Sequence, residues 1–175
     1  GADMPDLNYN NPDVRQAAKD AAGYWLELGL DGFRMDAAVH IYGAHEFKQQ
    51  EDSEAANITW WNEFAGYCES INPDVYLVGE VWQDDKVLEN YVQPFDTKFD
   101  FAIQQKILNC VQKGMAVPGF GDSLSVAIEN IQNKYDGVDA NYLNGIFGAN
   151  HDQDRIASSV NSLDKARQIA AVYMT

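Results

Sequence analysis

The sequence is poor in basic residues. Its 175 residues include 12 lysines and arginines against 27 aspartates and glutamates, which gives a net charge of −15. Such a field repels phosphate backbones and anionic lipid headgroups, and no cluster of basic residues offsets it. We therefore expect no nucleic acid partner and no membrane partner, whereas an uncharged ligand is compatible with this charge.

Cysteines are scarce, and long apolar runs are missing. Cys68 and Cys110 lie far apart in the sequence, each within a pattern of helical spacing, so they predict neither a disulfide framework nor a metal site. No stretch has the length and apolarity of a membrane span, and the first residues lack the pattern of a secretion signal. Hydrophobic residues still make up 46% of the chain, which is enough to bury a core.

An apolar run that ends in charged residues stands at positions 31–40, DGFRMDAAVH. Phe33 and Met35 alternate with Arg34 and Asp36, and this period of two predicts a strand over about residues 31–37. Ionisable residues at the C-terminal end of a strand are typical of the catalytic face of a parallel α/β barrel. On this stretch alone, a structural ion pair between Arg34 and Asp36 is an equally good interpretation.

The same construction recurs twice downstream. The segment VYLVGEVW at 75–82 is an apolar strand that ends in Glu80, and LNGIFGANHD at 143–152 ends in His151 and Asp152. Parallel strands that each deliver a carboxylate at the same end would bring these groups into one pocket. Most enzymes that hydrolyse glycosidic bonds use a pair of carboxyl groups.

The rest of the chain alternates between helical and extended patterns. Asn11 and Pro12 are a good helix N-cap and first helical residue, and Gly29 closes that helix. Further helices are expected over residues 57–70, 84–92, 102–113, 123–135, 153–160 and 163–174, with loops over 41–56 and 114–121 and a weak strand at 99–101. Repeated strand–helix units predict a parallel sheet.

Four motifs in this order resemble those of the α-amylase family of glycoside hydrolases, family thirteen. They are MPDLN at 4–8, GFRMD at 32–36 with His40, GEVW at 79–82 and NHD at 150–152. The resemblance implies an α/β fold of the (β/α)8 TIM-barrel type. Residues 1–175 would form part of a single catalytic barrel domain, about strands four to seven with their helices, without the first three strands and the eighth.

The resemblance also implies roles for the acids. Asp36 would be the nucleophile, Glu80 the acid/base and Asp152 the third carboxylate, which holds sugar hydroxyls. Arg34 would keep Asp36 ionised by its charge, and the apolar neighbours of Glu80 would favour its protonated form.

Further substrate contacts are expected from His151, His40 and Trp82, with Tyr42 and the 41–56 segment lining an aromatic cleft. Asp6 resembles a calcium-binding residue of many family members, although its turn is equally well explained by an Asx-turn. Calcium needs six or more oxygen ligands, and most would come from outside this chain. The chemistry itself requires no cofactor.

The expected function is a retaining α-glucan hydrolase that cleaves α-1,4 bonds of starch or maltooligosaccharides. By resemblance the small Ala37 favours α-1,4 over α-1,6 cleavage, and Val39 replaces a lysine that many α-amylases carry. The alternatives are an α-1,6-glucosidase or cyclodextrin-cleaving relative, and a non-catalytic glucan-binding or scaffold member of the fold. The partner would be an α-glucan. We expect the 175-residue piece alone to be inactive, and to form a homodimer through its exposed half-barrel edges.

Overall fold

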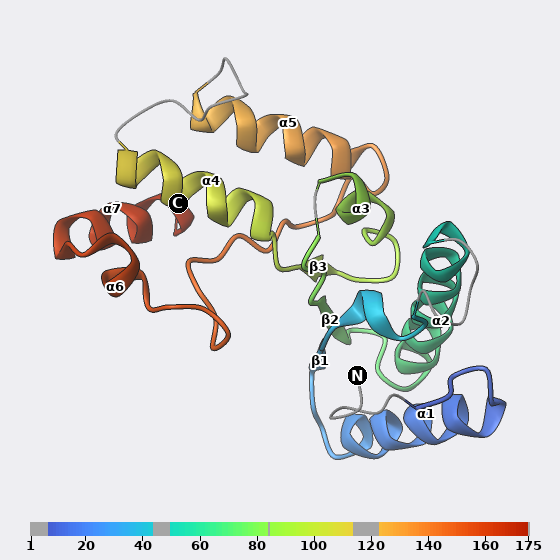
Figure 1. Cartoon of the computed structure of the whole chain (residues 1–175). Coiled ribbons are helices and arrows are strands. Elements are labelled where there is room, and N and C mark those ends of the chain that lie inside the picture. The colour runs from blue at the N-terminus through green and yellow to red at the C-terminus, as the bar shows by residue number, and fades with distance from the viewer. Residues whose placement is uncertain (1–6, 44–49, 84, 114–122, 175) are drawn as a thin grey trace. The chain divides into compact units, whose positions relative to one another are not determined.

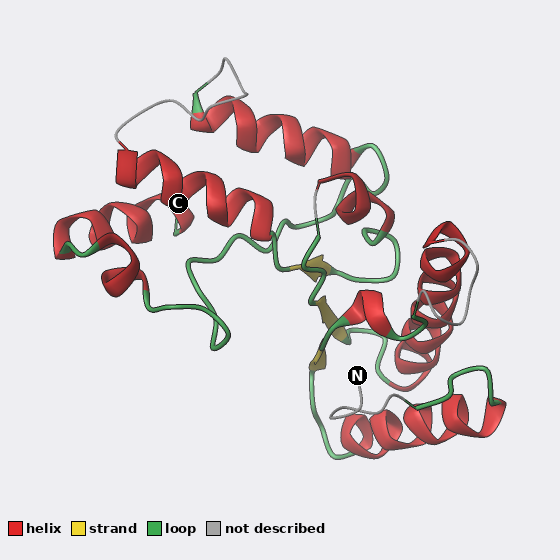
Figure 2. Ribbon diagram, viewed as in Figure 1, coloured by secondary structure: helices red, strands yellow, loops and turns green. Residues whose placement is uncertain are grey.

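The computed structural model describes residues 7–43, 50–83, 85–113 and 123–174. These residues divide into two compact units. The first comprises residues 1–80 and 93–97, and the second residues 81–92 and 98–175. Helices dominate both, and the strands are short (Figures 1 and 2).

The first unit contains two helix–strand pairs in sequence (Figure 1). Helix α1 (Pro12–Glu27) leads to strand β1 (Gly32–Met35), and α2 (Gln50–Ile71) leads to β2 (Tyr76–Gly79). A short 3-10 helix, η1 (Ala38–His40), lies between β1 and α2. Asn11 caps α1 as expected, because its side chain accepts a hydrogen bond of 2.9 Å from the backbone N–H of Asp13.

Strands β1 and β2 pair in parallel, and β3 (Thr97–Lys98) adds the third strand in the order β1-β2-β3. The register places Gly32 opposite Tyr76 and Met35 opposite Gly79. The two residues that directly follow these strands, Asp36 and Glu80, therefore come at the same level of the sheet. This register is the feature of the fold that positions the site.

The core of the first unit is rich in aromatic side chains. Trp60 and Trp61 of α2 are buried, and the ring of Trp61 lies 5.4 Å from that of Phe95. Both tryptophans therefore serve packing. Helix α1 is tied to α2 by an ion pair of 2.8 Å between Lys19 and Glu63.

The second unit consists of helices α3 (Asp85–Asn90), α4 (Phe101–Lys113), α5 (Leu124–Asp136), α6 (Ile156–Val160) and α7 (Leu163–Tyr173). Apolar side chains from α3, α4, α5 and α7 form its core, including Leu88, Ile107, Ile131 and Ile169. None of the described helices is long and apolar enough to cross a membrane.

Three sequence predictions differ from the structure. The weak strand predicted at 99–101 lies at Thr97–Lys98 instead, because α4 begins at Phe101. The predicted loop over 41–56 is wrong in its second half, because α2 begins at Gln50 in a stretch that contains good helix formers. The predicted strand over 143–149 is also wrong, because only Gly145 pairs, in a single parallel bridge to Phe99. Two glycines weaken that segment as a strand. The predicted loop at 114–121 lies outside the described residues.

The cysteines carry no disulfide. Cys68 is buried and Cys110 is half-buried, and both are free. Burial raises the pKa of the Cys68 thiol to about 11, with a smaller contribution from Glu69. The free thiols agree with the prediction from their spacing.

A lysine is fully buried in the second unit. The ammonium group of Lys98 lies 3.5 Å from the ring centroid of Tyr135 and 4.3 Å from that of Tyr142, and it donates a 2.9 Å hydrogen bond to the Tyr142 hydroxyl. Burial lowers the pKa of Lys98 to about 7, although the charge of Asp100 opposes this shift. Near neutral pH this side chain is therefore close to losing its proton.

We predict that replacement of Gly32 by alanine breaks the pairing of β1 with β2. The new methyl carbon would lie 1.8 Å from the carbonyl oxygen of Tyr76, so the strands would have to separate. The free energy of unfolding in urea should fall by about 3 kcal/mol or more. The matched control is Gly66→Ala in α2, where no atom lies within 4 Å. This control should stabilise by about 0.5–1 kcal/mol, and equal effects of the two substitutions would contradict the register.

We predict a pH dependence of stability from Lys98. Its folded-state pKa, about 7, lies below the unfolded value of 10.5, so the unfolded chain binds one more proton between these values. The free energy of unfolding should therefore rise from pH 7 to pH 9, by about 2 kcal/mol. The Lys98→Met variant should lack this rise, and an identical pH profile in both proteins would show that burial does not perturb Lys98.

Candidate active site

The two strands of the first unit end in the carboxylates that the sequence singled out. Asp36 directly follows β1 and Glu80 directly follows β2. Because Met35 and Gly79 are register partners, Asp36 and Glu80 leave neighbouring strands side by side. Neighbouring strands lie about 4.8 Å apart, so the backbone alone brings these two acids together at one sheet edge.

Arg34 joins the two carboxylates. Its Nη1 lies 2.7 Å from Oδ1 of Asp36, and its Nη2 lies 2.7 Å from Oε1 of Glu80. Burial lowers the pKa of Arg34, but the charge of Glu80 and the hydrogen bonds to both carboxylates outweigh it and raise that pKa above its ordinary value. The guanidinium group therefore remains charged and fixes the two acids relative to each other.

The two acids differ in exposure. The side chain of Asp36 is 73% exposed, whereas that of Glu80 is 10% exposed. The expectation of an apolar environment for Glu80 needs correction, because its oxygens contact Arg34 and the backbone N–H of Ala37, the latter at 3.1 Å. The two acids follow adjacent strands but have different environments: Asp36 is exposed, whereas Glu80 is buried and hydrogen-bonded.

The backbone immediately after Asp36 has an unusual conformation. Ala37 is in the left-handed region, with φ 45° and ψ 44°, which costs a non-glycine residue about 1–2 kcal/mol. The N–H groups of Ala37 and Ala38 donate to the side chain and the main-chain carbonyl of Glu80, respectively. The turn after one acid is thus held by the other acid. His40 lies at the end of this turn and is exposed.

Three further predicted site residues, Trp82, His151 and Asp152, belong to the second unit. Nε2 of His151 lies 3.3 Å from Oδ2 of Asp152, and both side chains are largely exposed. Asn150 starts this turn, because its side-chain oxygen accepts from the N–H of Asp152 at 3.0 Å. Trp82 is 51% exposed, and its ring stacks on Phe101 at 4.4 Å with an interplanar angle of 6°. Phe101 thereby covers one face of the Trp82 ring, and about half of the Trp82 side chain stays exposed.

A buried glutamine that sequence reasoning missed supports the loop of Asp152. Gln104 of α4 donates to the carbonyl of Gly148 at 2.8 Å and exchanges hydrogen bonds with Gln153. The oxygen of Gln153 in turn accepts from the N–H of Asn150 at 3.4 Å. No local pattern marks Gln104, because its partners lie more than 40 residues away.

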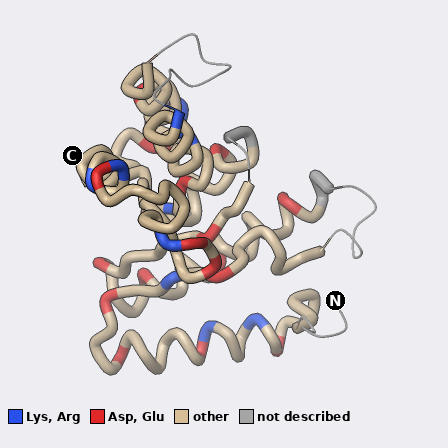
Figure 3. Tube along the Cα trace, turned by 60° about the vertical axis from the view of Figure 1, so that its left-hand side comes forward, with Lys and Arg blue, Asp and Glu red and all other residues tan. Residues whose placement is uncertain are grey.

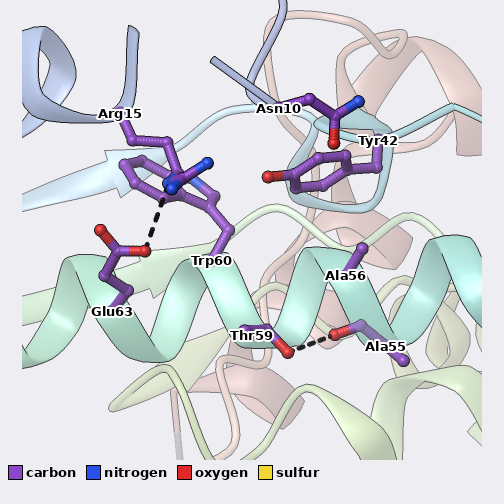
Figure 4. A pocket seen from close by; sticks show the side chains of 8 residues that line it. All are labelled: Asn10, Arg15, Tyr42, Ala55, Ala56, Thr59, Trp60 and Glu63. Atoms are coloured by element: carbon purple, nitrogen blue, oxygen red, sulfur yellow. Dashed lines mark hydrogen bonds and ion pairs between the residues drawn. The ribbon is translucent and has the colours of Figure 1, made fainter. Parts of the chain in front are cut away.

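Tyr42 does not line an open aromatic cleft. It is buried, and its hydroxyl donates to the carbonyl of Tyr9 at 3.0 Å. It contributes instead to a pocket of about 400 Å³ next to α2, and neither Asp36 nor Glu80 lines this pocket (Figure 4). The charged groups of this pocket are paired within the protein, since Nε of Arg15 lies 3.4 Å from Glu63.

The structure shows no metal centre among the residues it describes. No three His, Cys, Asp or Glu side chains in the described ranges lie close enough to share an ion. Acidic positions are instead spread along the chain (Figure 3). Asp6, the expected calcium contact, lies outside the described residues.

Comparison with known proteins gives consistent results. The model of the α-amylase catalytic domain matches residues 1–175. The chain is 38% identical to α-amylase 3 of Dictyoglomus thermophilum and 31% identical to a 4-α-glucanotransferase of Thermotoga neapolitana, over 99% and 93% of its length. A crystal structure of the α-amylase from H. orenii matches 98% of the chain with a TM-score of 0.82 at 36% identity. The chain covers 32%, 31% and 33% of these three proteins, about a third of each.

Proposed function

Because the chain belongs to the α-amylase family of glycoside hydrolases, we propose that the protein of which it forms a part cleaves α-1,4-glucosidic bonds of starch or maltooligosaccharides with retention of configuration. We refer to that longer polypeptide, with the whole barrel, as the complete protein. The chain forms a partial parallel sheet with helices. In the family's (β/α)8 barrel this sheet is complete.

The observation that carries the proposal is the bridge of Arg34 between Asp36 and Glu80. A retaining glycosidase needs its two carboxyl groups roughly 5–5.5 Å apart, whereas an inverting one needs about 6.5–9.5 Å to admit a water molecule. Adjacent strands in register, with one guanidinium group 2.7 Å from each acid, favour the shorter separation.

The proposed chemistry is a double displacement. Asp36 attacks the anomeric carbon and forms an ester with it while the bond to the leaving oxygen breaks, and Glu80, which enters this step as the neutral acid, gives that oxygen its proton. Glu80 then takes a proton from water, and the resulting hydroxide replaces Asp36 at the anomeric carbon. The exposure of Asp36 allows the sugar to reach it, and the hydrogen bonds to Glu80 hold its carboxyl group in place.

Three residues of the second unit are proposed to bind the substrate. Asp152 and His151 would hold hydroxyl groups of the sugar that is attacked, because paired polar groups on an exposed turn can form such bonds. Trp82 would stack on a further sugar ring through the exposed part of its side chain. A structural calcium ion in the complete protein remains compatible with this mechanism, which does not use it.

The second candidate function is cleavage of α-1,6 bonds or of cyclodextrins on the same carboxylates. Ala37 argues against a preference for α-1,6 bonds, because a small side chain next to Asp36 matches the residue that goes with α-1,4 cleavage. A non-catalytic glucan-binding role is a third reading, and the intact pair of acids with its arginine argues against it.

We predict that Asp36→Asn and Glu80→Gln each lower turnover of soluble starch by the complete protein at least about 10³-fold. Each substitution removes an ionisable group at nearly constant volume, so the thermal midpoint should change little. Reducing-sugar release and circular dichroism measure the two quantities. If either folded variant kept activity near that of the unchanged protein, the assigned roles would be wrong.

We further predict that the complete protein cleaves maltooligosaccharides much faster than isomaltose, by about 10²-fold or more in kcat/KM. The comparison requires only the release of reducing ends from both substrates under the same conditions. A preference for isomaltose would overturn the α-1,4 proposal and favour the α-1,6 reading, without affecting the assignment of the acids.

A further inference from the structure

One face of α2 binds the backbone that follows the nucleophile. Ser53, Asn57 and Trp61 are four residues apart, so they lie on the same face of the helix. Each of them hydrogen-bonds to the main chain between residues 38 and 42. Figure 1 shows η1 next to α2.

Asn57 is the central member of this set and uses both ends of its amide. Its Nδ2 donates to the carbonyl of Val39 at 2.9 Å, and its Oδ1 accepts from the N–H of Tyr42 at 2.8 Å. The residue is 1% exposed. A buried amide with both ends satisfied fixes its partners in distance and direction, because any movement would leave polar groups unpaired.

The neighbours of Asn57 extend this contact along the same segment. Nε1 of Trp61 donates to the carbonyl of Ala38 at 2.8 Å, and the hydroxyl of Ser53 donates to the carbonyl of Tyr42. Carbonyls and one N–H from residues 38–42 are thus held from the α2 side. On the other side, Glu80 holds the N–H groups of Ala37 and Ala38.

The segment between these two anchors contains the strained residue. Ala37, in the left-handed region, is joined directly to Asp36. Such a strained conformation persists only where several contacts with the surrounding structure hold it in place. Release of the α2 anchor would let Ala37 relax towards an ordinary conformation, and this would turn the backbone of Asp36 away from its position next to Glu80.

We propose that Asn57 is a positioning residue that holds the nucleophile, Asp36, in its reactive direction through the backbone of residues 37–39. The inference rests on the proposed function, because it assumes that Asp36 attacks the sugar. Asn57 touches neither substrate nor the reacting atoms. Its loss should therefore reduce the rate of the chemical step rather than the binding of substrate.

The first test compares Asn57→Leu with Cys68→Ala in the complete protein. Leucine has a similar volume and forms neither hydrogen bond, whereas Cys68 is a buried residue of the same helix that makes none of the hydrogen bonds to residues 38–42. At a temperature well below both thermal midpoints, Asn57→Leu should lower kcat on maltooligosaccharides about 10²-fold, because misplacement by about 1 Å has this effect. KM should stay within about threefold, and Cys68→Ala should change neither constant by more than that.

The second test uses Asn57→Asp and keeps the inference falsifiable if the leucine variant does not fold. A protonated aspartic acid donates to the Val39 carbonyl and accepts from the Tyr42 N–H, as asparagine does, whereas the ionised form lacks the donor and faces that carbonyl. The ratio of kcat in this variant to that of the unchanged protein should therefore rise by about tenfold from pH 8 to pH 5.

The outcomes separate the two proposals. A kcat ratio independent of pH, or a loss in Asn57→Leu no greater than in Cys68→Ala, would overturn the positioning role while Asp36→Asn stays inactive. A rise in KM at constant kcat would likewise contradict it, because it would assign Asn57 to substrate binding. An active Asp36→Asn variant in the same assay would instead overturn the proposed function itself.

Discussion

The site depends on one ionic contact, the bridge from Arg34 to Asp36 and Glu80. Two carboxylates on adjacent strands repel each other, and a single guanidinium group with two parallel donor directions compensates both. The bridge requires that β1 and β2 pair in register, and this register requires Gly32, which has no room for a side chain beside Tyr76. A lysine in place of Arg34 would supply the positive charge but not the two fixed donor directions of the guanidinium group.

The surroundings of this bridge explain how strain is maintained next to a reactive group. Ala37 keeps a left-handed conformation between two sets of hydrogen bonds, one from Glu80 and one from α2. The same principle recurs in the second unit, where Gln104 supports the turn that carries Asp152 through Gly148 and Gln153. In both units a buried amide on a helix determines the backbone of a loop that carries an acid.

Features of the fold that depend on local sequence patterns were predictable from the sequence. The alternation around Arg34 and Asp36 indicated a strand, and Asn11 marked the start of α1. Long-range contacts were not predictable, because the partners of Glu80 and the role of Asn57 depend on how distant segments meet. The segment at 143–149 looked like a strand from its apolar residues, yet a strand requires pairing along its length, and here only Gly145 pairs.

The most direct test of this account is to trap the covalent intermediate in the complete protein. A ring-fluorinated α-glucosyl fluoride reacts through the same first step, and the added fluorine slows hydrolysis of the ester. Mass spectrometry of the digested protein should find the sugar on the peptide that contains Asp36, and the Asp36→Asn variant should acquire none. A sugar ester on Glu80 or Asp152, or turnover of this reagent without any ester, would contradict the account.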